Sequence, residues 1–587
     1  MADQVHLTGG GTSVVVDLDG SPAVRYWGPA LAADPPAALF EHALPVGGLD
    51  QLVPISLLPE ASLGFPGPPG LSGSRMDGTD WAARLHVHAH RIDGTTLTLA
   101  LVDPIADLEV TVTLAVDPSG GVLSFRTQVT NGGSEPYALE HVSMTLPVGG
   151  DAGEVLTLGG RWAKEFRVDR QPWSHGGFVV ENRRGRTSHD HFPFMAVGGR
   201  GFDESTGSVW AAHLGWSGNT SLRVDRTADG RRYLQAGELL APGEVVLEPG
   251  GTYRSPPLYA AASGGGLNGI RQSFHALLRS RPAHPVTARP VLLNTWEAVY
   301  FDHDLDTLLA LADRAAEVGV ERFVLDDGWF HGRRDDSAGL GDWWVDDRVW
   351  PDGLEPLISH VKRRGMEFGI WVEPEMVNPD SDLYRTHPEW VLNDHRYEPV
   401  LGRRQLVLDV AEPDVSEYLF DHLDRLLTDH DVDYVKWDMN RDLVHATHQG
   451  RAGVHRQTLA VYALIDRLRA ANPDVEIESC SSGGGRADYG ILERTDRVWT
   501  SDCNDALDRI DIQYGAALLL PPELTGIHIG PPRSHTTGRT HRLDLRATVA
   551  FFGHLGIEWN LLEASREELE DLSRAIALHK EHRGLLH

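Results

Sequence analysis

Reactive side chains are concentrated at residues 433–441, which read DYVKWDMNR. The apolar start indicates a buried β-strand, along which successive side chains point to opposite faces. Lys436, Asp438 and Asn440 then share one face, away from Trp437 and Met439. A nearby ammonium group favours the ionised form of Asp438, which a carboxylate nucleophile requires. A structural salt bridge at a strand end explains this segment alone equally well, so both interpretations stay open at this point.

The other predicted strand ends carry the same two kinds of side chain, acids and indoles. Carboxylates accept hydrogen bonds from sugar hydroxyls, and tryptophan rings pack on the apolar C–H face of a sugar. A sugar-binding site is therefore the favoured interpretation. In chain order, the residues at these ends are Trp296, Glu297, Asp326, Asp327, Trp371, Glu373, Glu375, Asp409, Asp438, Cys480, Asp502 and Asp505.

Three other site chemistries have weaker support. The strand-end acids could hold Mg²⁺, but they alternate with tryptophans and are accompanied by Lys436. The run SSGGGR at 481–486 could hold a phosphate, yet it lacks the Lys-Ser/Thr ending of a P-loop. His86, His88 and His90 alternate along one strand, where an exposed or hydrogen-bonded strand face is favoured over a metal site. We expect neither a metal nor a cofactor at the site.

The first half of the chain is predicted to be β-structure. Alternating runs such as TLTLAL at 96–101 and VTVTL at 110–114 are separated by clusters of Gly, Asn and Asp. Regularly spaced short strands of this kind are typical of a large sandwich. The pattern changes near Arg289, so we expect a β domain over residues 1–285 and an α/β domain over 286–587.

The second half alternates strand and helix patterns. Eight β/α units over about 270 residues predict a TIM barrel, in which chemistry takes place at the C-terminal ends of the strands. A doubly wound open sheet is the alternative, but its glycine-rich first turn is missing. The expected barrel strands are 291–295, 322–325, 367–371, 406–409, 433–437, 475–479, 497–500 and 524–528.

Composition narrows the classes of partner and compartment. The 587 residues carry a net charge of −31, which disfavours nucleic acid and anionic membranes. The N-terminus shows no signal peptide, and no apolar run approaches the roughly 18 residues of a membrane span. Cys480 and Cys503 are the only cysteines, so we expect two free thiols rather than a disulfide scaffold. Together these features predict a cytoplasmic protein.

Six motifs together resemble those of bacterial α-galactosidases of glycoside hydrolase family 36. The resemblance covers most of the chain, and the N-terminal half matches more loosely, including GRTSH at 185–189. The motifs are NTWEAVYFD at 294–302, LDDGWF at 325–330, GIWVEPEMV at 369–377, YVKWDMNR at 434–441, ESCSSGGGR at 478–486 and WTSDCNDA at 499–506.

This resemblance implies an N-terminal β-supersandwich, a catalytic (β/α)8 barrel and a homo-oligomer, often a tetramer. It implies removal of terminal α-linked galactose from oligosaccharides such as melibiose and raffinose, with retention through a covalent galactosyl-enzyme. By motif, Asp438 would be the nucleophile and Asp502 the acid/base. The implied sugar-binding residues are Trp296, Asp326, Asp327, Trp371, Lys436, Asn440, Cys480, Ser482 and, by a weaker match, Arg75 from the N-terminal half.

Two departures from the family pattern accompany the resemblance. Ser482 stands where some relatives have glycine, which would tighten the pocket near the sugar. The chain stops at His587, without the C-terminal β-sandwich that relatives usually have. An α-N-acetylgalactosaminidase or a galactosyl transferase on the same barrel stays a possible reading. A sugar-binding relative without activity is disfavoured, because Asp438 and Asp502 are intact.

Overall fold

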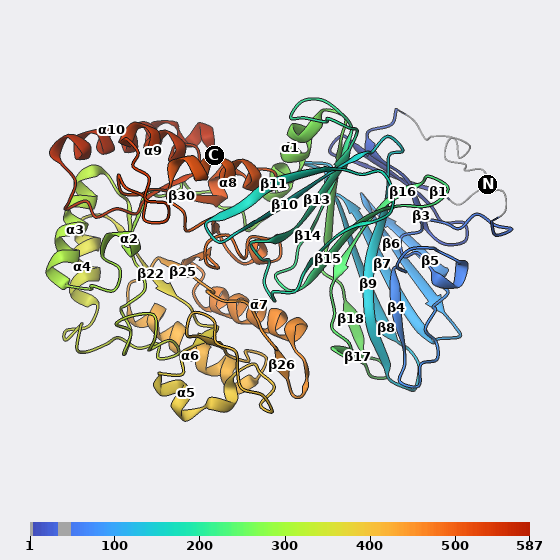
Figure 1. Cartoon of the computed structure of the whole chain (residues 1–587), viewed down its shortest axis with the longest axis horizontal. Coiled ribbons are helices and arrows are strands. Elements are labelled where there is room, and N and C mark those ends of the chain that lie inside the picture. The colour runs from blue at the N-terminus through green and yellow to red at the C-terminus, as the bar shows by residue number, and fades with distance from the viewer. Residues whose placement is uncertain (1–3, 33–47) are drawn as a thin grey trace.

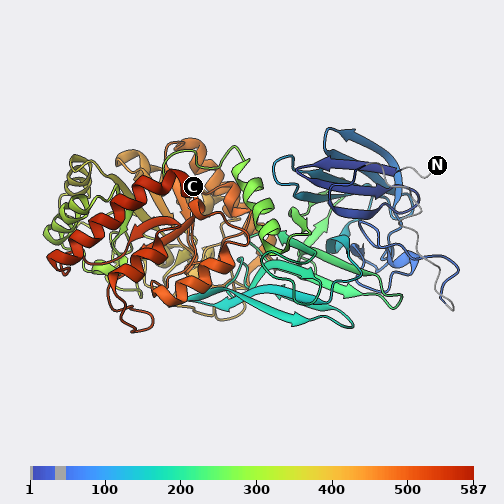
Figure 2. The ribbon, with the colours of Figure 1, turned by 90° about the horizontal axis from the view of Figure 1, so that it is seen from above.

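The chain forms a β-sheet region and a barrel that lie end to end (Figure 1). A computed structural model describes residues 4–32 and 48–587. Helix α1 (Gly266–Arg279) packs on the sheet region, and Figure 2 shows it beside the barrel, at the border between the two regions. The first barrel strand starts at Leu292. The predicted sandwich followed by a (β/α)8 barrel is confirmed.

The sheet region consists of antiparallel sheets of ten, six and three strands. The predicted alternating runs form β6 and β7, in which every second side chain is buried. This alternation places one face of each strand on the apolar core. The three-stranded sheet has β1 (Gln4–Gly9), β2 (Thr12–Asp17) and β3 (Ala23–Pro29); the ten-stranded sheet has β5 (His86–Asp93), β6 (Thr96–Asp103), β7 (Leu108–Val116), β8 (Leu123–Asn131), β10 (Glu154–Arg161), β11 (Lys164–Pro172), β13 (His191–Gly198), β14 (Val209–Leu214), β18 (Thr252–Arg254) and β19 (Leu258–Ser263); the six-stranded sheet has β4 (Leu71–Arg75), β9 (Tyr137–Val148), β12 (Phe178–Asn182), β15 (Thr220–Arg226), β16 (Arg232–Glu238) and β17 (Val245–Leu247).

Eight parallel strands close the barrel. Most are buried along their whole length, as expected for strands covered by helices on one side and a filled interior on the other. In order around the barrel they are β20 (Leu292–Asn294), β21 (Arg322–Leu325), β22 (Glu367–Val372), β25 (Tyr434–Trp437), β28 (Glu476–Ser479), β29 (Arg497–Trp499), β30 (Thr525–Ile529) and β31 (His554–Ile557).

One predicted barrel strand was wrong and one was missed. Leu406 and Val407 form β24, which pairs antiparallel with β23 (Met376–Val377) in a separate two-stranded sheet. In the barrel, β22 pairs directly with β25. The eighth strand is β31, beyond the last segment expected from the sequence. Asp438 therefore follows the fourth barrel strand and Asp502 the sixth, with β28 between them.

Some of the helices begin and end at recognisable capping signals. Helix α3 starts after Asp304, whose side chain accepts from the Thr307 N–H, and ends at Gly319 in the left-handed conformation. Helix α10 starts with a capping box of Ser565 and Glu568. Among the described residues, no helix combines the length and apolar character needed to cross a membrane. The α-helices of the barrel region are α2 (Trp296–Val299), α3 (Leu305–Val318), α4 (Glu355–Arg363), α5 (Asp382–Thr386), α6 (Pro413–Asp429), α7 (Val454–Ala471), α8 (Ala506–Ala516), α9 (Leu543–Ala550) and α10 (Arg566–Leu586). Two further short strands are β26 (Thr447–His448) and β27 (Arg451–Ala452).

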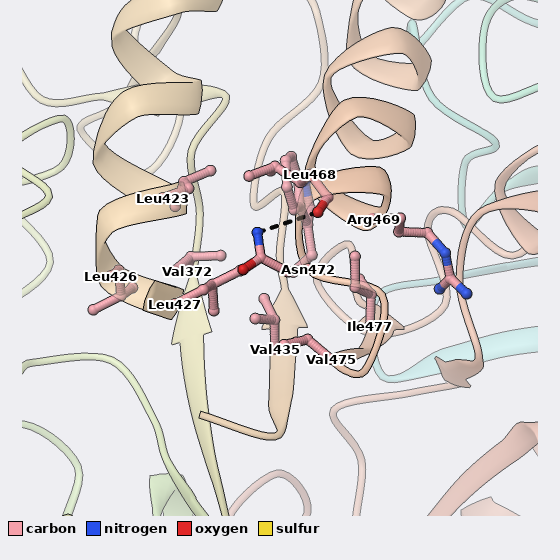
Figure 3. Close-up of a pocket in the computed structure, with 11 residues that line it drawn as sticks. Val372, Leu423, Leu426, Leu427, Val435, Leu468, Arg469, Asn472, Val475 and Ile477 are labelled. Atoms are coloured by element: carbon pink, nitrogen blue, oxygen red, sulfur yellow. Dashed lines mark hydrogen bonds between the residues drawn. The ribbon is translucent and has the colours of Figure 1, made fainter. Parts of the chain in front are cut away.

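The layer between the barrel and helices α6 and α7 is mostly apolar, with Asn472 and Arg469 among its valines, leucines and isoleucine (Figure 3). It contains a cavity of only about 10 Å³, no more than one water-sized space, lined by residues that include Val435 and Trp437. These two side chains of β25 face the helices. The alternate residues, Lys436 and Asp438, face the barrel interior instead, as the strand period requires. Packing on one face of β25 therefore sets the direction of the reactive face.

Candidate active site

A cavity of about 380 Å³ at the C-terminal ends of the barrel strands brings together most of the predicted site residues. It also receives Trp162 from the turn between β10 and β11 of the sheet region. Both carboxyl groups expected to carry out the reaction, Asp438 and Asp502, line it. The full lining is Trp162, Trp296, Glu297, Tyr300, Asp326, Asp327, Trp371, Arg403, Lys436, Asp438, Asn440, Asp502, His535, Thr536 and Glu558.

Asp438 follows β25 directly and is held by neighbours on both oxygens. Its Oδ2 accepts from the Trp371 indole N–H at 3.1 Å and from the Asn440 amide at 2.6 Å. Its Oδ1 accepts from the backbone N–H of Ser482 at 3.1 Å. Burial alone would raise the pKa of Asp438, but the charge of Lys436 and these hydrogen bonds hold it below its usual value. The carboxylate is thus ionised and fixed in direction.

Two neighbouring acids are each paired with a buried cation. Lys436 Nζ donates to Asp326 Oδ2 at 2.8 Å. Arg333 donates to both oxygens of Asp327, at 2.9 and 2.7 Å. Burial raises the pKa of Asp326 and of Asp327, and the paired cations oppose that rise. These pairs fix the two carboxylates at the floor of the cavity, where they can accept from ligand hydroxyls.

Asp502 has different surroundings from Asp438. Among the described residues, it accepts from two indole N–H groups, Trp162 at 2.8 Å to Oδ2 and Trp499 at 3.0 Å to Oδ1. Burial and the nearby negative charge of Asp438 raise the pKa of Asp502 above its usual value. Asp438 is therefore kept ionised, whereas Asp502 holds a proton more readily.

Asp505, the other acid of the same motif, does not line the cavity. It is the N-cap of α8, where Oδ1 accepts from the backbone N–H groups of Leu507 and Asp508. Its Oδ2 accepts from Thr537 at 2.5 Å and from Arg539 at 2.8 Å. Burial acts to raise the pKa of Asp505, but these hydrogen bonds outweigh it and bring the pKa to about 2. The interpretation of Asp505 as a helix cap is confirmed.

Cys480 and Ser482 contact the lining of the cavity from the loop that follows β28. Both are buried. The Ser482 hydroxyl donates to Asn440 Oδ1 at 3.0 Å, and its backbone has a φ of +47°, a conformation that favours glycine. Burial and the adjacent Asp438 carboxylate raise the pKa of the Cys480 thiol, so it stays protonated. Cys480 and Cys503 are both free thiols, as expected.

Arg75 is not brought to this cavity, which corrects the weakest of the expected site residues. It ends β4 in the sheet region, where its Nη1 donates to Asn131 Oδ1 at 2.9 Å and its Nε contacts Asp80 at 3.3 Å. The side chain lines a separate surface pocket together with Asp77 and Glu135. Its partners are thus those of a buried structural arginine.

The arginine that does line the cavity is Arg403, which sequence reasoning missed. It lies in the tight loop before β24, and its Nη1 donates to Asn440 Oδ1 at 2.5 Å. Trp162 was missed as well, because it comes from the other region of the chain. No sequence motif around Arg403 or around Trp162 indicates a site residue.

A third missed group is Glu558, which directly follows the overlooked strand β31. Its carboxylate accepts from His528 at 2.8 Å and from Asn294 at 3.0 Å. Burial of Glu297 and the nearby charge of Glu558 raise the pKa of Glu297 well above its usual value. The sequence had marked Glu297 only as a strand-end acid. Glu297 therefore holds a proton more readily than an exposed carboxyl does.

The segment 185–189 of the sheet region supports the loops that hold the nucleophile candidate. Arg186 is buried and donates to the backbone oxygen of Met439 at 2.8 Å and to Ser481 Oγ at 3.0 Å. His189 Nε2 lies 2.8 Å from the backbone oxygen of Ser482. The loosely matching N-terminal motif thus contacts both the loop that carries Asp438 and the loop that follows β28.

Comparison with known families matches nearly the whole chain. The model of the glycosyl hydrolase family 36 N-terminal domain matches residues 20–248, and the melibiase model matches residues 252–587. An α-galactosidase of Escherichia coli is 46% identical over 570 residues, covering 96% of this chain and 80% of the relative. The α-galactosidase AgaA of Geobacillus stearothermophilus is 36% identical, covering 85% of this chain and 70% of the relative.

Solved structures agree with the sequence relatives. The crystal structure of AgaA superimposes with a TM-score of 0.93 at 32% identity, covering 100% of this chain and 87% of that chain. Variants of AgaA have been solved in complex with raffinose, with stachyose and with 1-deoxygalactonojirimycin. An α-galactosidase from Lactobacillus brevis superimposes with a TM-score of 0.94 at 30% identity, covering 100% of this chain and 84% of that chain.

Proposed function

Since the chain belongs to glycoside hydrolase family 36 and is an α-galactosidase, we propose that it releases terminal α-linked galactose with retention of configuration through a covalent galactosyl-enzyme. The observation that carries this proposal is the contrast between Asp438 and Asp502. They line one cavity, and their surroundings lower the pKa of the first and raise that of the second. Two carboxyls with separated pKa values are the arrangement that supports an acid and a nucleophile.

In the first step, Asp438 attacks the anomeric carbon while Asp502 donates its proton to the leaving oxygen. The bond to the aglycone breaks as the bond to Asp438 forms. In the second step, Asp502 removes a proton from water, which attacks the same carbon and releases Asp438. Strands β25 and β29 flank β28, which supports placing the two carboxyls on facing sides of the sugar. A retaining enzyme requires them about 5–5.5 Å apart.

We assign galactose recognition to the remaining polar and aromatic groups of the cavity. Asp326 and Asp327 would accept from the axial O4 hydroxyl and from O6, which disfavours glucosides. Lys436 and Asn440 would contact further hydroxyls, and Cys480 and Ser482 would limit space at the 2-position. Trp296 and Trp371 would form the walls. The pairing of each acid with its own cation supports this assignment, because it holds the acceptor oxygens in place and opposes the effect of burial on their pKa values.

The natural substrates we propose are galactosyl oligosaccharides of the raffinose type and melibiose. This rests on the AgaA variants solved with raffinose and stachyose, combined with the shared family and fold. The cavity of about 380 Å³ has room for one terminal sugar and part of the next.

The test is a panel of nitrophenyl glycosides together with an NMR assay of the first product. The α-galactoside should be cleaved far faster than the α-glucoside, the β-galactoside and the α-N-acetylgalactosaminide. The signal of α-galactose should appear before that of the β-anomer. Initial release of β-galactose would overturn retention, and equal cleavage of the α-N-acetylgalactosaminide would overturn the substrate assignment.

A further inference from the structure

A second group of ligand-type side chains lies outside the catalytic cavity. Asp409, Glu412 and His448 place one oxygen or nitrogen atom each within 4.8 Å of the others, and they are the only such trio among residues 4–32 and 48–587. They come from three elements: Asp409 lies two residues after β24, Glu412 is the N-cap of α6, and His448 ends β26. None of them lines the catalytic cavity.

The spacing of these atoms fits one shared ion. Ligands that bind a metal at 2.0–2.2 Å stand about 3.0–3.5 Å from one another in tetrahedral or octahedral geometry. His448 Nδ1 is 2.9 Å from Asp409 Oδ2 and 3.7 Å from Glu412 Oε1. Gln449 donates to Glu412 Oε1 at 3.2 Å, which restrains that carboxylate. Shifts of a few tenths of an ångström would bring the three groups around a single cation.

An independent observation comes from Asp409 Oδ1. The residue is only 5% exposed, and this oxygen has no hydrogen-bond partner in the described structure. Buried carboxylate oxygens nearly always have a donor or a cation beside them. His448 Nδ1 lies 2.9 Å from the other carboxylate oxygen, Asp409 Oδ2, and this hydrogen bond holds the side chain in its present orientation. A cation beside Asp409 would balance this oxygen.

The surroundings favour entry of a positive ion. Asp409 and Glu412 line a cavity of about 600 Å³, and its lining also includes the further acids Glu389, Asp394 and Asp414. The one arginine of the lining, Arg396, is taken up by Asp394 at 2.5 and 2.8 Å. Clefts lined by one sign of charge concentrate ions of the opposite sign.

We propose that Asp409, Glu412 and His448 form a structural site for a divalent transition metal ion, Zn²⁺ or Mn²⁺. One imidazole nitrogen with two carboxylate oxygens suits these ions, whereas Ca²⁺ prefers six to eight oxygen ligands. The ion would join the segment before α6, which includes β24, to the β26–β27 hairpin. It would take no part in glycoside cleavage, since it lies outside the cavity that holds Asp438 and Asp502.

The experiment measures metal binding directly on the full-length enzyme. After EDTA treatment and dialysis, we expect ZnCl₂ or MnCl₂ to bind in a 1:1 ratio by titration calorimetry, with CaCl₂ at least about tenfold weaker. Saturating metal should raise Tm by about 2 °C or more, because the ion binds only the folded chain. Glu412→Gln and His448→Gln should each weaken the binding by at least about tenfold.

The matched control is His455→Gln. His455 forms a partly buried histidine–carboxylate pair, with Glu238 at 2.9 Å, and belongs to no trio of closely spaced ligand atoms among the described residues. This variant should bind metal as the parent enzyme does. The proposal fails if the parent shows no saturable binding of Zn²⁺ or Mn²⁺, or if Glu412→Gln and His448→Gln both bind like His455→Gln. The trio would then be a hydrogen-bonded histidine–carboxylate cluster without a bound ion. Since Glu412 is only partly buried, Glu412→Gln decides the question even if His448→Gln does not fold.

Discussion

Trp162 of the sheet region donates its indole N–H to Asp502 of the barrel at 2.8 Å, across 340 positions of sequence. The turn between β10 and β11 holds this tryptophan, and β11 packs against α8, the helix that follows Asp502. The carboxyl that we assign as acid/base is thus tuned by a residue outside its own domain. An indole donor stabilises the ionised form, so it limits how far burial raises the pKa of Asp502.

Trp162→Phe should move the alkaline limb of the kcat/KM profile to higher pH. The pKa of Asp502 rises when the donor is lost, and the first step needs Asp502 protonated, so the acid stays active at higher pH. At its maximum, kcat/KM should fall by no more than about tenfold, a loss of about 1.4 kcal/mol. The measurement is a pH–rate profile with nitrophenyl α-galactoside. Trp81→Phe, an exposed tryptophan of the same region, is the control. An unmoved limb in Trp162→Phe would show that Trp162 does not act through Asp502.

Asp438→Ala should lower kcat by at least about 10⁴-fold with the fold retained, because it removes the attacking oxygen. A fluorinated galactoside that traps the intermediate should label Asp438 of the parent enzyme, as shown by peptide mapping. Asp431→Asn is the control, since Asp431 is an exposed partner of Lys362 near the other end of the same strand. Label on a different residue, with an active Asp438→Ala variant, would rule out this role for Asp438.

Much of the barrel could be predicted because its strands are apolar and end in polar motifs. Residues 322–325 were expected as a strand and form β21 with the same ends. Leu406 and Val407 have the same apolar character but pair with β23 outside the barrel, and local sequence does not distinguish the two settings. The strand β31 begins with His554 and contains a glycine, which weakens the apolar pattern, so the strand was missed together with Glu558.

The floor of the site was likewise predictable, whereas its rim was not. Strand alternation places Lys436 and Asp438 on the same face at the end of β25, and Asp326 follows β21. The barrel brings these strand ends together around one cavity. Trp162 and Arg403 lie in turns, and their place in the cavity depends on how the two regions dock and how a short loop folds. The same docking decides against Arg75, because its strand β4 pairs with β9 and its side chain lines a separate surface pocket of the sheet region.

Ser482→Gly should relax the preference for galactosides over N-acetylgalactosaminides. The φ of +47° suits glycine, so the variant should fold, and loss of the hydroxyl frees space beside Asn440 near the 2-position. We expect the ratio of kcat/KM values for the two nitrophenyl substrates to fall by about tenfold, typical of a small change in pocket volume. Asp107→Gly, at an exposed residue of the sheet region in the same left-handed conformation (φ +49°), is the control. An unchanged ratio would place the 2-position elsewhere.

The acid/base role separates Asp502 from Asp505 most sharply. Asp502→Ala should still form the galactosyl-enzyme from a dinitrophenyl galactoside, whose leaving group needs no proton, yet barely cleave melibiose or raffinose. Azide should accelerate its turnover by replacing water in the second step, and should give an α-galactosyl azide. This pattern identifies the residue that transfers the proton, because only the missing acid/base is bypassed by a good leaving group and a charged nucleophile.

Asp505→Ala should behave in the opposite way. Its carboxylate caps α8 and its pKa of about 2 leaves no proton to donate at neutral pH. Loss of the cap should lower the free energy of unfolding by about 0.5–2 kcal/mol, and the ratio of melibiose to dinitrophenyl galactoside cleavage should stay that of the parent. The stabilisation from the ionised cap is present above the usual carboxyl pKa and is lost as the pH falls towards 2, so the two proteins should converge in stability in acid. If Asp505→Ala instead shows azide rescue while Asp502→Ala does not, the two roles are exchanged.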